Sequence, residues 1–461
     1  FDATGGVVTF TGAGTLQVSH ATITSFGSLT STVGTIAFDG AGAQNIPAGT
    51  YYSLDINQSG TKSITGDITV NGDITLTDGE LDLNGNHDLY LKGDLSKTNG
   101  ALVNSSSSNG YLILEATSSE NLSQAICGFT APSISIKKIN SGNAEVTGDI
   151  SANYIWLQSA NSGTFTIDNN YNLDVDDKIV VSGGTLNILS GSLSTSKNSS
   201  SAHELTGGTL DIDGGTVSFG SSSNTTADLN IDGGALDISG GTLNVSDCID
   251  IETGTFTQTG GVVNVKTYTS GNGDSDHKFA MDAGTLNLTG GTMNLLDEHE
   301  DADHYSMYIS SGVTTASNVA HTINILTNDA SNDEDRYIDL GGASNAIGNL
   351  SFDLTGHELY FKSNADILGD LIATNGDIDV SSYTVNVTGN AEFTNDDLLI
   401  STGILDVDGT FNAPNNITFS GRPEVSDSTI KTASFVPATT RSSSESSNSF
   451  GDGLSKYFPS L

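Results

Sequence analysis

The sequence predicts an all-β fold, a parallel β-helix or β-solenoid in which short strands stack turn upon turn. Three observations predict it: a repeated Gly-Gly strand motif, a spacing in the twenties between copies, and apolar residues that alternate with polar ones. Such spacing is typical of repeat proteins whose turns share one core. At about 26 residues and about 4.8 Å per turn, the chain is expected to form a rod of roughly 15 to 18 coils, continuous or divided into stacked sub-modules.

The first expected part, residues 1–119, contains short strands without the double glycine. Four consecutive strands occur at 68–70, 74–76, 81–83 and 89–91, each with two apolar residues around a polar one. Alternate side chains of a strand point to opposite faces, so each apolar pair faces a core. The steps of 6 to 8 residues between the strands predict that the four pairs occupy the faces of one coil.

The second expected part, residues 120–340, contains the Gly-Gly repeats. Each copy resembles Gly184-Thr-Leu-Asn-Ile188, and glycine supplies the positive φ that a sharp corner requires. The copies begin at Gly184, Gly208, Gly215, Gly234, Gly241, Gly261 and Gly291. We expect an inward change such as Ile238→Asp to disrupt stacking, and an outward change such as Asn244→Ser to have little effect.

Two acidic insertions, 297–304 and 328–335, interrupt these repeats about one coil apart, so we expect them to lie side by side. Carboxylates clustered on loops are the ligands that Ca²⁺ prefers. The candidate calcium ligands are Asp297, Glu298, Glu300, Asp301, Asp303, Asp329, Asp333, Glu334 and Asp335. The alternative is two solvated loops without a metal, and no other cofactor is expected.

The last expected parts are C-terminal coils at residues 341–430 and a Ser-rich linker or tail at 431–461, which ends in apolar residues as if another module began. The chain starts at Phe1 without an initiator Met, so we expect a processed protein or a fragment of a longer one.

The charge balance excludes several partners. The chain has 15 Lys and Arg against 55 Asp and Glu, a net charge of −40. Binding nucleic acid requires basic side chains that displace counterions, so no nucleic acid partner is expected. No run of 18 apolar residues is present, so no membrane span is expected. Cys127 and Cys248 lie in apolar stretches and are expected to be buried free thiols.

Tyr154 and Trp156 form the candidate carbohydrate-binding pair. If Ile155 and Leu157 face the core, both aromatic rings stand outside as a platform for a sugar ring. The opposite register, in which both rings pack inside, fits the spacing about as well. Both registers remain open at the level of the sequence.

The runs Tyr52-Ser-Leu-Asp-Ile56, Gly72-Asp-Ile-Thr-Leu76 and Gly79-Glu-Leu-Asp-Leu83 carry a resemblance. In style, residues 40–410 resemble the repetitive β-rich segments of large secreted and surface-displayed proteins of Bacteroidota. The resemblance implies export by a type IX secretion system and a role as adhesin, filament or scaffold. A C-terminal sorting domain, expected in such proteins, is not visible in this sequence.

These observations predict a non-enzymatic structural or adhesive module of an extracellular or cell-surface protein, acting as a stiff acidic rod. Its expected partners are other copies or modules of the same protein, and glycans or surfaces. The alternative is a polysaccharide-acting or carbohydrate-binding right-handed β-helix, because paired carboxylates are invisible in sequence. An ice-binding solenoid is disfavoured, since Thr-x-Thr recurs irregularly. No hydrolase nucleophile motif and no Cys/His metal spacing is present.

Overall fold

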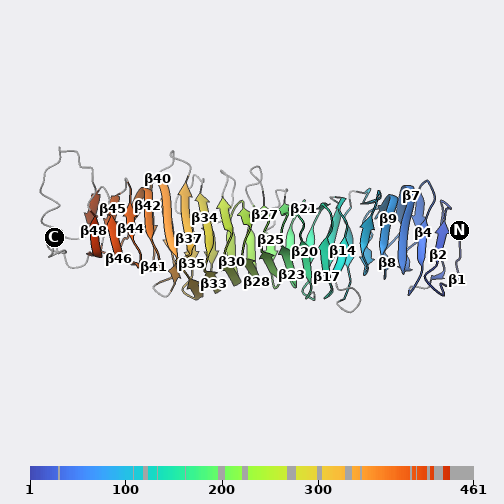
Figure 1. Cartoon of the computed structure of the whole chain (residues 1–461), viewed down its shortest axis with the longest axis horizontal. Helices are drawn as coiled ribbons and strands as arrows, with labels where there is room; N and C mark the ends of the chain where they lie inside the picture. The colour runs from blue at the N-terminus through green and yellow to red at the C-terminus, as the bar shows by residue number, and fades with distance from the viewer. Residues whose placement is uncertain are drawn as a thin grey trace. The chain divides into compact units, whose positions relative to one another are not determined.

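The computed structural model describes most of the chain. The described residues are 1–29, 32–106, 108–117, 123–131, 133–160, 162–195, 203–220, 227–266, 277–297, 304–327, 335–342, 345–394, 397–400, 402–412, 416–419 and 429–436. They form 48 β-strands and no helix, stacked in parallel as a β-solenoid of about 17 turns (Figure 1). The predicted fold class is therefore confirmed.

The chain divides into two compact units. Unit 1 comprises Phe1–Asn224 and Asp232–Asp237, and unit 2 comprises Thr225–Ile231 and Ile238–Leu461. The expected boundaries at residues 119, 340 and 430 stay predictions. Residues 437–461 of the expected tail lie outside the described residues.

Unit 1 consists of three parallel sheets, which follow one another along each turn. The first sheet contains β6 (Gly49–Tyr51), β8 (Ile68–Val70), β10 (Leu89–Leu91), β13 (Gly110–Leu114), β16 (Ile134–Lys138), β19 (Ile155–Leu157), β22 (Ile179–Val181) and β25 (His203–Leu205). The second contains β2 (Thr15–Val18), β4 (Thr35–Phe38), the starts of β7 (Ser53–Ile64) and β9 (Ile74–Asp82), β11 (Leu95–Lys97), β14 (Ser123–Ile126), β17 (Asn143–Val146), β20 (Thr164–Ile167), β23 (Thr185–Ile188) and β26 (Thr209–Ile212). The third contains β5 (Gln44–Ile46), the ends of β7 and β9, β12 (Ala101–Val103), β15 (Phe129–Thr130), β18 (Ile150–Ala152), β21 (Asn172–Val175), β24 (Ser192–Thr195) and β27 (Thr216–Phe219). At the start of the unit β1 (Val7–Val8) pairs with β3 (Ser28–Leu29).

Unit 2 repeats this arrangement. Its first sheet contains the start of β28 (Leu229–Ile238), the start of β30 (Ile249–Gln258), β32 (His277–Met281), β35 (His304–Ile309), β38 (Arg336–Asp339), the ends of β40 (Asn349–Phe361) and β42 (Leu371–Asp379), β45 (Asp397–Ile400) and β47 (Asn416–Phe419). Its second contains the end of β30, β33 (Gly284–Leu288), β36 (Val313–Ser317), β39 (Ala346–Ile347), β41 (Ala365–Ile367), β43 (Thr384–Val387) and the starts of β46 (Ile404–Asn412) and β48 (Thr429–Val436). Its third contains β29 (Thr242–Val245), β31 (Val262–Lys266), β34 (Gly291–Asp297), β37 (His321–Thr327), the starts of β40 and β42, β44 (Ala391–Phe393) and the ends of β46 and β48.

The register shows that one turn has three faces, so the expectation of four apolar pairs in one coil was wrong. Ile68 pairs with Leu89, Ile74 with Leu95, and Leu81 with Leu102. The pair at 89–91 therefore lies on the sheet of 68–70, one turn and 21 residues later. Every corner has a similar local pattern, and only the pairing partner shows where a turn closes.

The turns differ in length because the corners absorb extra residues, in unit 1 also between the first and second sheets, where Leu95 pairs with Ile126, and in unit 2 before the first sheet. In unit 2, Ile249 pairs with Phe279, and Phe279 with Met307, so these two turns take 30 and 28 residues. Strand β31 ends at Lys266 and β32 begins at His277, whereas the third-sheet strands themselves stay in register. About 26 residues per turn is therefore only an intermediate value.

The predicted inward residues form the core. In the Gly-Gly repeats, Leu186, Ile188, Leu210 and Ile212 are fully buried, whereas Asn187 between the first two is half-buried on the outside. Of the seven motif glycines, Gly184, Gly215, Gly241, Gly261 and Gly291 have the predicted positive φ, whereas Gly208 and Gly234 do not. At Gly261, φ is 65°, and an added Cβ would meet Gly240 O at 2.5 Å, so only glycine fits there.

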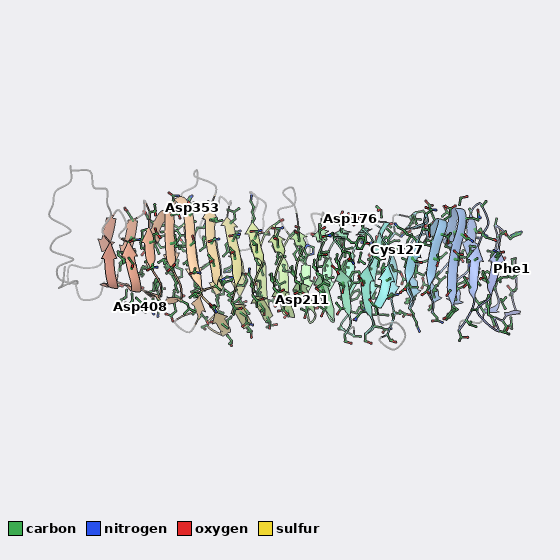
Figure 2. The ribbon with its side chains drawn as sticks, viewed as in Figure 1. Phe1, Cys127, Asp176, Asp211, Asp353 and Asp408 are labelled. Carbon is green, nitrogen blue, oxygen red and sulfur yellow. The ribbon has the colours of Figure 1, made fainter. Side chains whose placement is uncertain are left out.

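Several buried polar side chains bind backbone carbonyls at the corners. The Lys62 ammonium donates to Gly40 O, Gly42 O, Gln58 O, Ser59 O and Gly60 O at 2.9–3.2 Å. Cys127, labelled in Figure 2, is a buried free thiol, and so is Cys248. The pKa of Cys127 is raised to about 11 by burial. Both cysteines are therefore as the sequence predicts.

Candidate functional site

The sheets of each unit differ in the side chains on their outer faces. Outward aromatic residues gather on the first sheet, whereas the second and third present mainly Thr, Asn, Ser and Asp. The outward aromatic residues of the first sheet are Tyr90, Tyr111 and Trp156 in unit 1, with Tyr154 directly before β19, and Tyr305, Tyr308, Tyr337 and Tyr360 in unit 2, whereas Tyr171 and Tyr383 directly precede strands of the third and second sheets. The first sheet is therefore the face with the most surface chemistry.

Strand β19 turns Tyr154 and Trp156 outward. Ile155 and Leu157 are 0% and 1% exposed and point into the core, and the two aromatic residues are half-buried on the outside. Their ring centroids lie 6.4 Å apart with the planes at 52°. Of the two registers compatible with the sequence, the structure has the outward one.

Lys137 connects these rings to an aromatic residue of an earlier turn. It lies opposite Trp156 in the pairing of β16 with β19. Its Nζ is 4.8 Å from the Trp156 ring centroid and 5.7 Å from that of Tyr111, within the range of a cation–π interaction. Tyr111, Lys137, Tyr154 and Trp156 thus come from three consecutive turns, and we call them the Trp156 cluster.

The Trp156 cluster covers apolar residues that also lie on the outer face. Ile113 pairs with Lys137, and Val180 with Trp156, yet they are only 3% and 6% exposed. The indole Nε1 of Trp156 is buried and has no hydrogen-bond acceptor. Most buried donors in proteins have a partner, so this N–H is an exception with a cost in free energy.

Carboxylates surround the cluster. Burial raises the pKa of Asp88, and the nearby Asp67 carboxylate adds to the rise, whereas Lys137 opposes it. Lys178 Nζ forms an ion pair with Glu204 Oε1 at 2.9 Å. The pKa of the Tyr154 hydroxyl is raised, first by burial and then by Glu204. The potential around the cluster is therefore mainly negative.

Unit 2 carries a ladder of tyrosines on its first sheet. The ring centroid of Tyr337 lies 5.6 Å from that of Tyr305 and 5.6 Å from that of Tyr360, so the three rings follow successive turns. Lys362 Nζ lies 3.9 Å from the Tyr337 ring centroid. The Tyr360 hydroxyl donates to Glu358 Oε2. We call Tyr305, Tyr337 and Tyr360 the tyrosine ladder.

The strands that flank the two acidic insertions lie on adjacent turns. Asp297 pairs with Thr327 before the insertions, and His304 pairs with Arg336 after them. Asp335 lies beside the tyrosine ladder, where burial and then Glu358 raise its pKa. The candidate ligands Glu298, Glu300, Asp301, Asp303, Asp329, Asp333 and Glu334 lie outside the described residues. In the described part of the chain, no group of three or more His, Cys, Asp or Glu is placed to hold a metal ion.

The sequence did not predict a second polar constellation in unit 2. Cys248 Sγ donates to Asp228 Oδ1 at 3.3 Å, and Asp228 also shares a hydrogen bond with Asp247. Burial raises the pKa of Asp228, which the two hydrogen bonds and the Lys278 ammonium partly oppose. Asp247, Cys248 and Lys278 are at most 5% exposed. We call Asp228, Asp247, Cys248 and Lys278 the acid–thiol cluster. Because two carboxyl groups hydrogen-bond to each other only through a proton, one acid of this cluster keeps its proton more readily than an exposed Asp does.

The signal for the acid–thiol cluster is weak in the sequence. Asp228, Cys248 and Lys278 each stand directly before the first inward residue of a first-sheet strand. The intervals between them are unequal, because the corner insertions differ in length. A fixed repeat period therefore does not align them.

Comparisons with protein-family models, with curated proteins and with solved structures find no match to this chain. Among the described residues, no helix is long and apolar enough to cross a membrane.

Proposed function

We propose that the chain is a structural and adhesive repeat module of an extracellular surface protein or fibre. In this proposal the second and third sheets of each unit are a hydrated scaffold, and the first sheet is the contact face for glycans on a surface. The observation that carries the proposal is the gathering of outward aromatic rings on the first sheet. Aromatic side chains offer a large rigid contact area at a low entropic cost, as a binding face requires.

The remainder of the surface supports the scaffold role. The net charge of −40 makes copies repel one another and keeps the module hydrated. Aspartates such as Asp176, Asp211, Asp353 and Asp408 recur along both units (Figure 2). The stacked core needs no metal or disulfide to hold each turn, because every turn is buried by its neighbours. Other modules of the same polypeptide are the proposed partners along the chain.

Retention of the purified chain on glycan-coated surfaces tests the adhesive role. We expect Tyr305→Ser with Tyr360→Ser in the tyrosine ladder to lower retention, because they remove half-buried outward rings from the contact face. Thr185→Ser with Thr209→Ser, on the second sheet, serves as the matched control. This variant should be retained on the surface as strongly as the unchanged chain. Equal retention of both double variants would contradict the assignment of the first sheet as contact face.

A polysaccharide-acting enzyme is the second candidate, and the acid–thiol cluster is the observation that favours it. Burial raises the pKa of Asp228, which shares a hydrogen bond with Asp247, and a carboxyl group that keeps its proton in this way can act as a general acid. An assay of reducing-end release from a panel of polysaccharides decides between the candidates. Release that Asp228→Asn abolishes would replace the adhesive proposal, and we expect none.

A further inference from the structure

We propose that the Trp156 cluster is a binding subsite for a ring of a neutral sugar chain. The inference rests on the proposed role of the first sheet as contact face and adds the class of ligand. It concerns unit 1 alone and names Trp156 and Tyr154 as the stacking residues, with Lys137 as the hydrogen-bond donor.

The cluster presents two tilted aromatic rings to a ligand. Tyr154 and Trp156 stand together outside β19 with their planes at 52°, and Lys137 Nζ lies over the Trp156 ring, so a sugar that stacks on this face of the indole displaces the ammonium to its edge. Tyr111 extends the surface to an earlier turn. The outward Ile113 and Val180 lie beside Lys137 and Trp156 on the neighbouring turns and are nearly covered, so the apolar surface exists without a ligand. The C–H face of a pyranose ring packs on such a surface by dispersion and loses little polar hydration.

Polar groups at the cluster match sugar hydroxyls. The Trp156 Nε1–H is buried and has no acceptor. A small rotation of the indole toward a ligand hydroxyl would give this donor the bond that the free protein lacks. The Lys137 ammonium, the Tyr154 hydroxyl and the Glu204 carboxylate of the ion pair supply further donors and acceptors at the rim. A few polar groups around an apolar platform give orientation and specificity.

The charges disfavour acidic sugars. After burial, the carboxylates of Asp88, Asp67 and Glu115 raise the pKa of Tyr90, which lies on the same sheet. The carboxylates of Glu204 and Asp177 likewise raise the pKa of Tyr154. Of the nearby lysines, Lys178 is paired with Glu204, which leaves Lys137 against several carboxylates. A uronate or sulfated chain would meet repulsion there, whereas a neutral chain would not. The ligand class is therefore a neutral hexose or pentose polymer.

Tryptophan fluorescence tests the proposal directly, because Trp156 is the single tryptophan of the chain. The full chain is titrated with xylohexaose, cellohexaose and mannohexaose, and with hexagalacturonate as the acidic counterpart. We expect a saturable change in emission with at least one neutral hexasaccharide, and none with hexagalacturonate. No change with any neutral hexasaccharide, or a stronger response to hexagalacturonate, would overturn the proposal.

Two variants separate binding from packing, and circular dichroism first verifies that each is folded. Tyr154→Ala keeps the fluorophore, and we expect it to lower the affinity for the neutral hexasaccharide at least tenfold. Lys137→Met keeps the length of the side chain and removes its hydrogen-bond donor. Tyr52→Ala, at an exposed tyrosine of the corner between β6 and β7, several turns from the cluster, is the control and should leave binding unchanged. A folded Tyr154→Ala chain that binds like the unchanged chain would refute the subsite.

The outcomes distinguish this inference from the proposed function. If the Trp156 emission does not change with any neutral hexasaccharide but surface retention still depends on the tyrosine ladder, the Trp156 cluster serves only packing and the adhesive role stands. If retention is independent of the ladder while fluorescence responds to neutral sugar, the subsite stands and the general contact face does not.

Discussion

At the scale of single residues, buried polar side chains hold the corners of the turns. Lys62 is fully buried, and its ammonium binds five backbone carbonyls. Burial lowers its pKa. Such a residue would be read from sequence as a solvated lysine, because its strand position alone does not reveal the carbonyls that surround it.

We expect Lys62→Met to destabilise unit 1 by about 2–4 kcal/mol, because several buried carbonyls lose their donor and no water replaces it. Denaturant unfolding measures the change. Lys97→Met, at an exposed lysine of β11, is the control and should cost less than about 0.5 kcal/mol. Equal stability of the two variants would show that the carbonyl cage contributes nothing.

His321 makes unit 2 sensitive to acid. Its Nε2 is 3.0 Å from Gln258 Oε1, and its Nδ1 is buried without a partner. Burial lowers the pKa of the imidazole to about 4. The unfolded chain takes up a proton below about pH 6.5 and the folded chain only near pH 4, so stability is complete above pH 6.5 and falls as the pH drops toward 4.

The expected loss from His321 is about 2 kcal/mol between pH 7 and pH 5. His321→Met should be less stable at pH 7 but should lose less on acidification, as unfolding curves at the two pH values measure. His20→Gln, at an exposed histidine, should keep the slope of the unchanged chain. An identical slope in the His321 variant would show that another group causes the acid sensitivity.

At the scale of elements, a ladder of amides ties the third sheet of unit 2. Asn264 donates to Asn244, Asn294 to Asn264, and Asn324 to Asn294, each at 2.8 Å. The four residues occupy one outward column on β29, β31, β34 and β37. The ladder changes the expectation for Asn244→Ser. Because this substitution removes the acceptor of the Asn264 side-chain amide, we now expect a measurable loss of stability.

We expect Asn294→Ala to cost about 2 kcal/mol and Asn324→Ala about 1 kcal/mol, because the first removes two hydrogen bonds of the ladder and the second removes one. Hydrogen exchange of the β31, β34 and β37 amides reports the effect locally. Equal protection of the backbone amides from exchange in both variants would show that the asparagine side chains bond equally well to water.

The strands themselves were predictable, and their assembly was less so. A motif such as Gly184-Thr-Leu-Asn-Ile188 contains both the corner and the inward pair, so local chemistry decides the strand. The number of faces depends on which turn pairs with which, as with Ile68 and Leu89, and this information is not local. The outward register of Trp156 and the acid–thiol cluster depend on the same pairing across unequal turns.

At the scale of the whole molecule, charge repulsion opposes folding. Burial and neighbouring carboxylates raise the pKa of Asp211, Asp250 and Asp377, which indicates that like charges are crowded on adjacent turns. Excess negative charge destabilises a compact state, and cations relieve this. Calcium binding at the acidic insertions stays a prediction from the sequence.

We expect millimolar Ca²⁺ to raise the melting temperature above that in chelator, and by more than NaCl of equal ionic strength. Asp301→Asn with Asp303→Asn should reduce the calcium-specific part, because it removes two candidate ligands. Asp174→Asn with Asp149→Asn, in unit 1, is the control for lost charge. An equal rise of the melting temperature with Ca²⁺ and with NaCl would contradict specific calcium binding at the acidic insertions.

The unequal turns have a consequence for how such a chain can change over time. In unit 2 the extra residues enter between a third-sheet strand and the next first-sheet strand, while Asn264, Asn294 and Asn324 keep their column. This corner therefore tolerates insertions without a shift of register, because the cost of closing a longer loop grows slowly. A foreign peptide grafted between Lys266 and His277 should be displayed on the surface with the solenoid intact. New binding segments can arise there by simple gain of sequence, one turn at a time.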